Sequence, residues 1–113
     1  NMDSTRQNKV NRLLQKELGE FFQRESRTFF NGAFITVTAV RITPDLSMAR
    51  VHLSIFIEKD KAAVMAKVNE IKKEIRKRIG NKVGKQMRIV PNFEFFIDDS
   101  LDYAENIDKL LKK

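Results

Sequence analysis

Hydrophobic residues recur along the chain at two periods, one typical of helices and the other of strands. In residues 4–25 the apolar side chains are three and four positions apart, which places them on one helical face. They are Val10, Leu13, Leu14, Leu18, Phe21 and Phe22. Ser4 and Gln7 have the spacing of a capping box. We therefore predict a helix over residues 4–25.

Strand patterns begin after this helix. Residues 34–42 are rich in Thr, Val and Ile. Residues 48–57 alternate, with apolar side chains on one face at Val51, Leu53, Ile55 and Ile57. A turn cluster around Pro44 and Asp45 separates the two segments, so we predict an antiparallel hairpin. Residues 87–97 form a third predicted strand, whose apolar face carries Phe93, Phe95 and Ile97.

A long helix is predicted after Asp60, a residue that can cap its start. Its narrow apolar seam consists of Val64, Val68, Ile71, Ile75 and Ile79. Asp99 and Ser100 can cap a short last helix, whose apolar stripe is Leu101, Ala104, Ile107, Leu110 and Leu111. The order α-β-β-α-β-α predicts one α+β domain over residues 2–113. In it, helices cover one face of a three-stranded sheet.

Charge is concentrated in the second long helix and the residues after it. The chain has a formal net charge of +7, and residues 59–88 hold eleven Lys and Arg against three acids. A concentrated basic segment favours a polyanionic partner. A solvated helix face that is charged for solubility is the alternative. Charge alone leaves open whether the partner is RNA, DNA, an anionic membrane or an acidic protein.

Candidate catalytic residues are few. His52 is the only histidine and the chain has no cysteine, so a metal site lacks ligands and we expect a surface or sheet-edge histidine. Asp98 and Asp99 could hold Mg²⁺ or act as acid and base, but their place before a helix favours capping. Phosphate-loop, dinucleotide and nucleophile-elbow motifs are absent. No apolar run approaches the roughly 20 residues of a membrane span. We expect a soluble, non-enzymatic, cytoplasmic protein without a cofactor.

Aromatic residues are numerous, with nine phenylalanines in 113 residues. Phe29, Phe30 and Phe96 do not fall on the main apolar stripes. They could stack on nucleic-acid bases or fill a secondary apolar cluster, and we favour packing.

Three segments resemble the ribosome-binding factor A family. TVTAVRITPDLSMARVHLSIF (Thr36–Phe56) is similar to the strand–turn–strand pattern of that family. EIRKRIG (Glu74–Gly80) and RIVPNFEFFIDDSL (Arg88–Leu101) are similar in kind and order. The resemblance implies a type II KH-like fold. It also implies a non-enzymatic bacterial factor that binds the free 30S subunit and 16S rRNA. Such a factor supports late 30S maturation, 16S rRNA 5′-end processing and growth in the cold.

On this basis we predict a monomer that binds RNA through a set of basic side chains and does not bind membranes. The set is Arg50, Lys72, Lys73, Arg76, Lys77, Lys82, Lys85 and Arg88. Arg50 matches the hairpin motif and either contacts RNA or braces the sheet.

Two features of the long helix remain to be decided by structure. The family bends this helix at small residues where this chain has Ile71, Lys72 and Lys73, so we predict a milder bend or none. Gly80 and Gly84 are four apart, whereas the KH backbone clamp is G-x-x-G. We therefore predict that Gly84 ends the helix and that Gly80 lies in its last turns.

Overall fold

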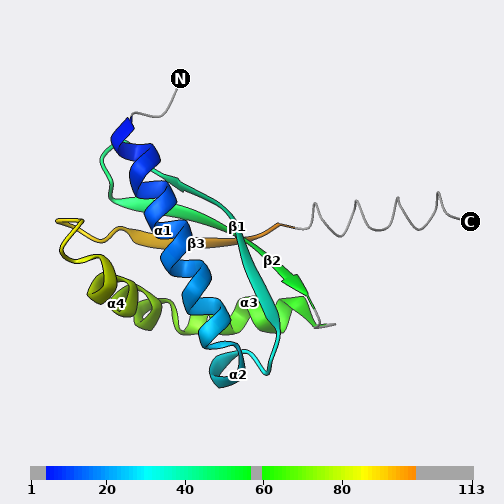
Figure 1. The fold of residues 1–113 in the computed structure, drawn as a ribbon. Coiled ribbons are helices and arrows are strands. Elements are labelled where there is room, and N and C mark those ends of the chain that lie inside the picture. The colour runs from blue at the N-terminus through cyan, green and yellow to red at the C-terminus, as the bar shows by residue number, and fades with distance from the viewer. Residues whose placement is uncertain (1–4, 57–59, 99–113) are drawn as a thin grey trace, which may run out of the picture.

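The computed structural model describes residues 5–56 and 60–98 (Figure 1). The helices are α1 (Thr5–Arg24), α2 (Ser26–Phe29), α3 (Lys61–Glu70) and α4 (Lys72–Val83), and the strands are β1 (Phe34–Ile42), β2 (Met48–Phe56) and β3 (Asn92–Ile97). The first helix and the hairpin therefore lie where the hydrophobic pattern predicts them. The expected helix over residues 101–111 lies outside the described residues.

The three strands form one mixed sheet in the order β1-β2-β3. The hairpin is antiparallel and runs from the pair Phe34–Phe56 to the pair Ile42–Ala49, with one irregularity between Val37 and Ala39. β3 pairs with β2 in parallel. A parallel pair needs a crossover, and α3 and α4 provide it.

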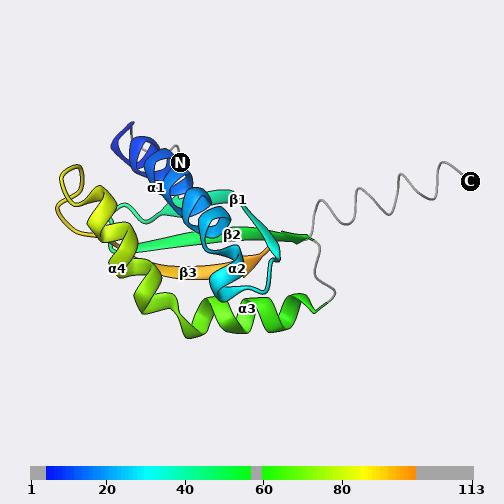
Figure 2. The same ribbon diagram turned by 60° about the horizontal axis from the view of Figure 1, so that its bottom comes forward.

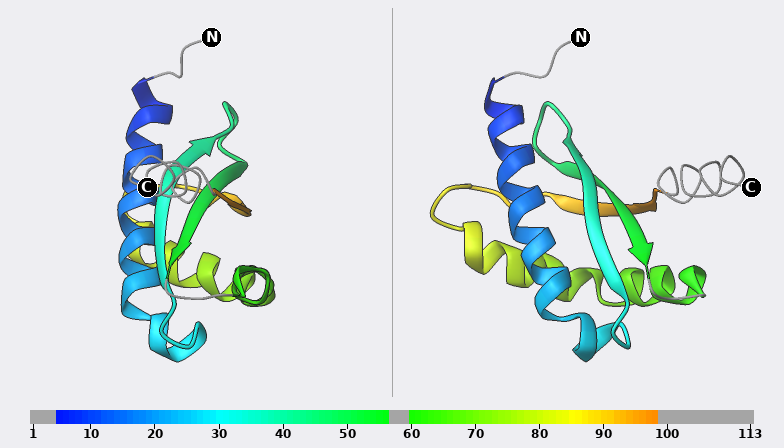
Figure 3. Two further views of the ribbon diagram at one scale, coloured as in Figure 1. Left: turned by 90° about the vertical axis from the view of Figure 1, so that its right-hand side faces the viewer. Right: turned by 45° about the vertical axis from the view of Figure 1, so that its right-hand side comes forward.

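All the large helices lie on one face of the sheet (Figures 1 and 3). Side chains on this face of the strands are buried, because strand residues alternate between the two faces. The core joins them to the apolar stripes of the helices: Leu14, Leu18, Phe21, Phe22, Ile35, Val40, Val51, Leu53, Ile55, Val68, Ile75 and Ile79. The predicted α+β layer arrangement is confirmed.

The prediction of a straight or mildly bent second helix was wrong. α3 ends at Glu70 and α4 begins at Lys72, with Ile71 between them at φ −99° and ψ 17°. Figure 2 shows the two helices running in different directions. Hydrogen bonds still cross the bend, because the Ile71 amide donates to the Lys67 carbonyl and the Ile75 amide to the Ile71 carbonyl. Val68 and Ile75 are both fully buried. Because the sheet twists, the bend allows the apolar side chains of both α3 and α4 to pack against it.

The third strand is shorter than predicted, since β3 begins at Asn92 and not at residue 87. Pro91 has no amide to donate to a strand ladder, and the first ladder bond beyond it runs from the Asn92 amide to the Ser47 carbonyl. Phe93 and Phe95 are buried as predicted, whereas Ile97 is 43% exposed at the strand end.

A buried polar residue on α1 was not predicted. The side chain of Asn11 is buried, and its Oδ1 accepts a hydrogen bond of 2.8 Å from the amide of Ile42, the last residue of β1. This contact satisfies a strand amide that a hydrocarbon side chain would leave unpaired. Sequence periodicity gives no sign of it, because Asn11 reads as one polar residue beside an apolar stripe.

We expect Asn11→Ala to lower the free energy of unfolding by about 1–3 kcal/mol, the cost of an unpaired buried amide. Urea unfolding followed by circular dichroism measures this. Asn8→Ala is the matched control, since Asn8 is exposed on the same helix. Equal stability of the two variants would show that the Asn11–Ile42 hydrogen bond contributes nothing.

Candidate nucleic-acid interface

The basic residues of α4 lie opposite its buried side. Ile75, Ile79 and Val83 face the core, at spacings of four that follow one side of a helix. Lys73 and Lys77 are exposed, and Lys72 is half-buried. The loop that follows α4 adds Lys85 and Arg88, which are also exposed, as is Lys82 in the last turn. The helix and its loop therefore present cations from adjacent segments.

Six of the predicted cations have neither an ion-pair nor a hydrogen-bond partner for their side chains in the part of the chain that the structure describes: Lys72, Lys73, Lys77, Lys82, Lys85 and Arg88. We call these six the α4 patch. Part of its charge has a structural role, because Lys82 near the end of α4 complements the helix dipole. The other charges have no comparable structural partner and are available to an external anion.

Arg76 differs from its neighbours. Its Nη2 donates to the Val90 carbonyl at 2.7 Å and its Nε to the Pro91 carbonyl at 3.2 Å. These two bonds attach α4 to the segment just before β3. The structure therefore gives Arg76 a bracing contact, and a direct phosphate contact would have to use its remaining N–H groups.

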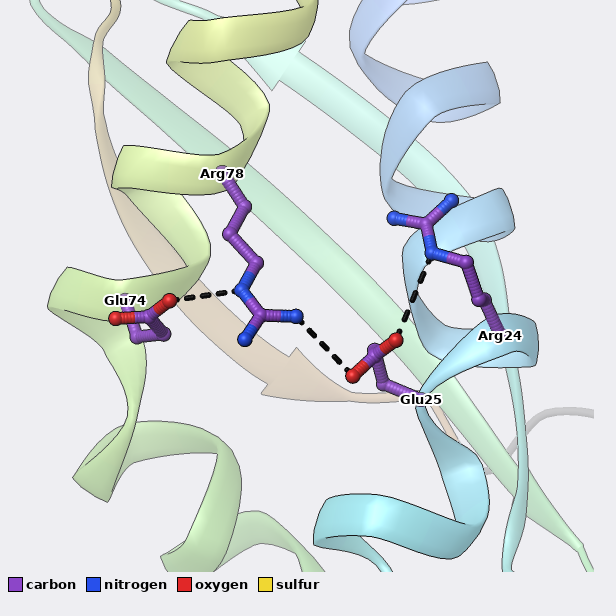
Figure 4. A network of polar contacts seen from close by, with 4 residues as sticks. All are labelled: Arg24, Glu25, Glu74 and Arg78. Atoms are coloured by element: carbon purple, nitrogen blue, oxygen red, sulfur yellow. Dashed lines mark hydrogen bonds and ion pairs between the residues drawn. The ribbon is translucent and has the colours of Figure 1, made fainter.

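Arg78 belongs to an ion-pair network on the other side of α4 (Figure 4). Its Nε donates to Glu74 at 2.7 Å and its Nη1 to Glu25 at 3.1 Å, and Glu25 also pairs with Arg24 at 3.6 Å. The hydrogen bond to Glu74, followed by the negative charge of Glu25, raises the pKa of Arg78. Its guanidinium also lies 5.6 Å from the ring centre of Phe29. Arg78 thus joins α4 to the α1–α2 corner and is not part of the patch.

The two glycines end the helix and do not form a clamp. α4 runs through Gly80 to Val83, and Gly84 is its C-cap, as predicted. Gly84 has right-handed backbone angles, φ −56° and ψ −27°, so a left-handed cap is not the reason for glycine here. A Cβ on Gly84 would lie 3.0 Å from the Gly80 carbonyl oxygen. Close backbone approach explains this glycine.

A groove of about 340 Å³ connects the patch to α1 and to the hairpin turn. Arg88 and Arg6 line it together with Asp45 of the turn, and Val10, Leu46 and Met87 contribute apolar walls. Sequence reasoning missed Arg6, since α1 and the loop after α4 are far apart in the chain. The sequence prediction for this helix used only its apolar stripe. The positive charge of Arg6 was the available sign that the helix could also contribute to a basic surface.

The hairpin turn beside this groove is held by Asp45. Its Oδ1 accepts hydrogen bonds from the Thr43 hydroxyl at 2.7 Å and from the amide and hydroxyl of Ser47. The Thr43 bond, followed by the Ser47 bonds, lowers the pKa of Asp45. The carboxylate therefore remains ionised to lower pH than an ordinary Asp and can accept these three hydrogen bonds there.

Arg50 does not join the patch. It lies on the face of β2 that the helices leave uncovered, where its Nε is 3.6 Å from a carboxylate oxygen of Glu94 on β3. The α4 patch and Arg50 therefore lie on opposite layers of the molecule. Of the two roles expected for Arg50, the structure shows the sheet-bracing contact.

The aromatic residues divide between the two faces. Phe30 is buried and Phe29 packs against Phe21, so packing is confirmed for both. Phe96 is 39% exposed on the open face of the sheet, where it stacks on His52 at 5.4 Å between ring centres. His52 is half-buried on the open face of the central strand. Of the two places expected for it, the surface and a sheet edge, the structure shows the first.

Residues 5–56 and 60–98 contain no cluster of three potential metal ligands. Asp98 accepts a 2.7 Å hydrogen bond from Thr38, and Asp99 lies outside the described residues. None of the described helices is long and apolar enough to span a membrane.

Comparison with known proteins decides the family. The family model of ribosome-binding factor A matches residues 6–111. The chain belongs to the ribosome-binding factor A family. A ribosome-binding factor A of Cytophaga hutchinsonii is 45% identical over 112 residues, which cover 99% of this chain and 84% of the relative. One of Christiangramia forsetii is 37% identical and covers 97% of this chain and 85% of its own.

Solved structures of ribosome-binding factor A have the same fold. The crystal structure from Thermus thermophilus matches with a TM-score of 0.65 at 24% identity, over 80% of this chain and 94% of that one. A Thermus thermophilus homology model, fitted into a cryo-EM map of a 30S–RbfA complex, matches with a TM-score of 0.56 at 23% identity, over 77% and 93%. The predicted α+β, type II KH-like fold is thus confirmed.

Proposed function

We propose that this protein is a non-enzymatic assembly factor that binds the free 30S ribosomal subunit through 16S rRNA. It acts in the cytoplasm in late 30S maturation and in processing of the 16S rRNA 5′ end. The observation that carries the proposal is the α4 patch, six cations without carboxylate partners on one helix and its following loop. Membership of the ribosome-binding factor A family supports the choice of partner.

The chemistry of the patch suits a folded RNA. Lys and Arg side chains neutralise backbone phosphates and release counterions, which gives affinity without reading sequence. Structured RNA is recognised largely through backbone and shape. The groove between Arg6 and Arg88 extends this surface beyond α4. In this proposal Arg76 holds α4 against the segment before β3 and so positions the patch.

We expect binding to 30S subunits to weaken steeply with salt. If all six cations of the patch contact phosphates, affinity falls by about 10³-fold between 50 and 200 mM monovalent salt. Co-sedimentation with purified 30S subunits over this range measures the slope. A salt-independent association would contradict a phosphate-binding surface.

Competition separates this function from a general basic binding module. Random duplex DNA and an acidic protein are added to the 30S binding assay, and 70S particles are tested in parallel. We expect 30S to be retained against both competitors and preferred over 70S. Depletion of the protein in cells should cause precursor 16S rRNA to accumulate. Equal affinity for duplex DNA and unchanged 16S rRNA processing would both contradict the proposal.

A further inference from the structure

The groove beside the hairpin turn is built from three segments that are far apart in the chain. Its walls come from the first turns of α1, the turn between β1 and β2, and the loop after α4. Figure 2 shows the start of α1 and that loop at the same end of the molecule. The volume of about 340 Å³ lies at the lower end of the roughly 300–1,000 Å³ of small-ligand sites. The groove therefore suits a ligand of modest size.

Charges of both signs line this groove without pairing with each other. Arg6 and Arg88 are exposed, and neither guanidinium has an ion-pair or hydrogen-bond partner among the described residues. Asp45 also lines the groove and forms no ion pair with either arginine. The bonds from Thr43 and Ser47 all end on its Oδ1, so Oδ2 can accept a hydrogen bond from a ligand. The groove thus offers two cationic donors and one anionic acceptor.

Apolar side chains form the rest of the walls. Met87 is buried in the core, and Val10 and Leu46 are partly buried and pack against it. Ile89, which is 67% exposed, lines the same groove from the loop after α4. Apolar side chains can hold the flat faces of a nucleobase that has left its stack. The walls therefore suit a base, whereas the arginines suit a phosphate.

Backbone hydrogen bonds fix two of these walls in place. Leu46 has φ 63°, a left-handed conformation that is uncommon for leucine, and its amide donates to the Thr43 carbonyl at 2.8 Å. The Met87 amide donates to the Val83 carbonyl at 2.9 Å. Because the turn and the loop are already ordered, a ligand would not have to order them when it binds.

The combination of groups selects one class of ligand. An inorganic phosphate would use the arginines but neither Asp45 nor the apolar walls. An acidic peptide would place its carboxylates beside that of Asp45, which is unfavourable. A nucleotide uses all three features, since its phosphate accepts from arginine, its base packs on apolar side chains and its base N–H groups donate to a carboxylate.

We propose that this groove binds one unpaired guanine nucleotide of a single-stranded RNA segment. Arg6 and Arg88 hold its phosphate, and Asp45 accepts from the base edge. Guanine fits best, because its ring N–H and its amino group are adjacent donors, whereas uracil has one ring N–H. Arg88 belongs both to the groove and to the α4 patch, so the neighbouring phosphates of the same strand can follow the patch. This inference rests on the proposed RNA binding and adds a base preference to it.

Binding of short RNA tests the proposal. Labelled pentanucleotides UUGUU and UUUUU are titrated against the full chain and followed by fluorescence anisotropy, and the methyl signals of Leu46 and Met87 are followed by NMR. We expect UUGUU to bind about tenfold more tightly, the worth of one hydrogen bond to a charged group, and to shift both methyl signals. GMP alone should bind more weakly than UUGUU, because it lacks the flanking phosphates. Equal affinity for GMP and UUGUU would overturn the assignment to an RNA strand.

Two variants separate the roles of the groove residues. Arg6→Gln should weaken UUGUU binding by about tenfold. Arg12→Gln is the matched control, because Arg12 is exposed on the same helix and does not line the groove. Asp45→Asn keeps Oδ1 for the turn and replaces Oδ2 by an N–H donor, so the preference for UUGUU over UUUUU should disappear. An equal loss for both RNAs would mean that Asp45 acts only through the turn, and would overturn the proposed base contact.

The outcomes distinguish this inference from the proposed ribosome binding. Equal affinity for UUGUU and UUUUU in the unmodified chain, equal binding by Arg6→Gln and Arg12→Gln, or equal competition by a polyglutamate peptide would each overturn the guanine site. None of these results would affect salt-dependent co-sedimentation with 30S subunits. Conversely, UUGUU binding in the groove by a chain that does not co-sediment with 30S would support the site and contradict the proposed function.

Discussion

Reversing two charges of the α4 patch, in Lys73→Glu/Lys77→Glu, is expected to weaken binding to 30S subunits by about 2 kcal/mol, roughly 30-fold in Kd. Each reversal removes one favourable phosphate interaction and adds one repulsion of similar size. Both side chains are exposed and have no partner in the described structure, so the fold should remain intact. The log–log salt dependence should also become shallower by about two.

The control must show whether binding depends on where the positive charges lie or only on the total net charge of the protein. Arg27→Glu/Arg41→Glu lowers the net charge equally, from +7 to +3, with exposed residues on α2 and on the open face of β1. We expect this control to bind 30S with much less loss than the α4 variant. Equal losses would mean that only total charge matters, and unchanged co-sedimentation of the Lys73/Lys77 variant would remove the patch from the binding surface.

Truncation of Phe22 is expected to have the largest effect on stability. This side chain is fully buried where α1 meets the sheet, with Phe21 at 5.4 Å, Phe30 at 5.6 Å and Phe95 at 6.2 Å between ring centres. Phe22→Ala removes these contacts and leaves a cavity, at a cost of about 3–5 kcal/mol. Such a loss is a large share of the roughly 5–15 kcal/mol that stabilises a domain.

Urea unfolding measures this cost, and Phe22→Leu is the graded control. Leucine keeps an apolar side chain in the site, so we expect its cost to be below about 1.5 kcal/mol. A loss of less than about 1 kcal/mol for Phe22→Ala would show that the four rings do not form the centre of the core. In that case the contact between Phe22 of α1 and Phe95 of β3 would contribute little to the stability of the domain.

Element types followed from local pattern, because side-chain periodicity is a property of neighbouring residues. The stripe of Leu14, Leu18 and Phe22 predicted α1, and the alternation of Val51 and Leu53 predicted β2. The basic character of α4 was equally visible. The bend at Ile71 was not predicted, since it depends on where Val68 and Ile75 meet a twisted sheet.

The candidate site shows the same division. Sequence grouped Arg50, Arg76 and Lys77 as cations of one kind. In the structure, Arg50 pairs with Glu94 on the opposite face of the sheet. Arg76 donates hydrogen bonds to the carbonyls of Val90 and Pro91, whereas Lys77 has no partner among the described residues. It also brings Arg6 beside Arg88.

The sequence by itself determined the first helix, the helical character of residues 61–83, the hairpin, most of the core and a concentrated positive charge. The tertiary structure decided the parallel pairing of β3 with β2, the bend between α3 and α4, and which of the predicted cations have partners among the described residues. These depend on contacts between residues far apart in the chain, such as Arg78 with Glu25 and Asn11 with Ile42. A local pattern carries charge and polarity, but only packing specifies the partner of each group.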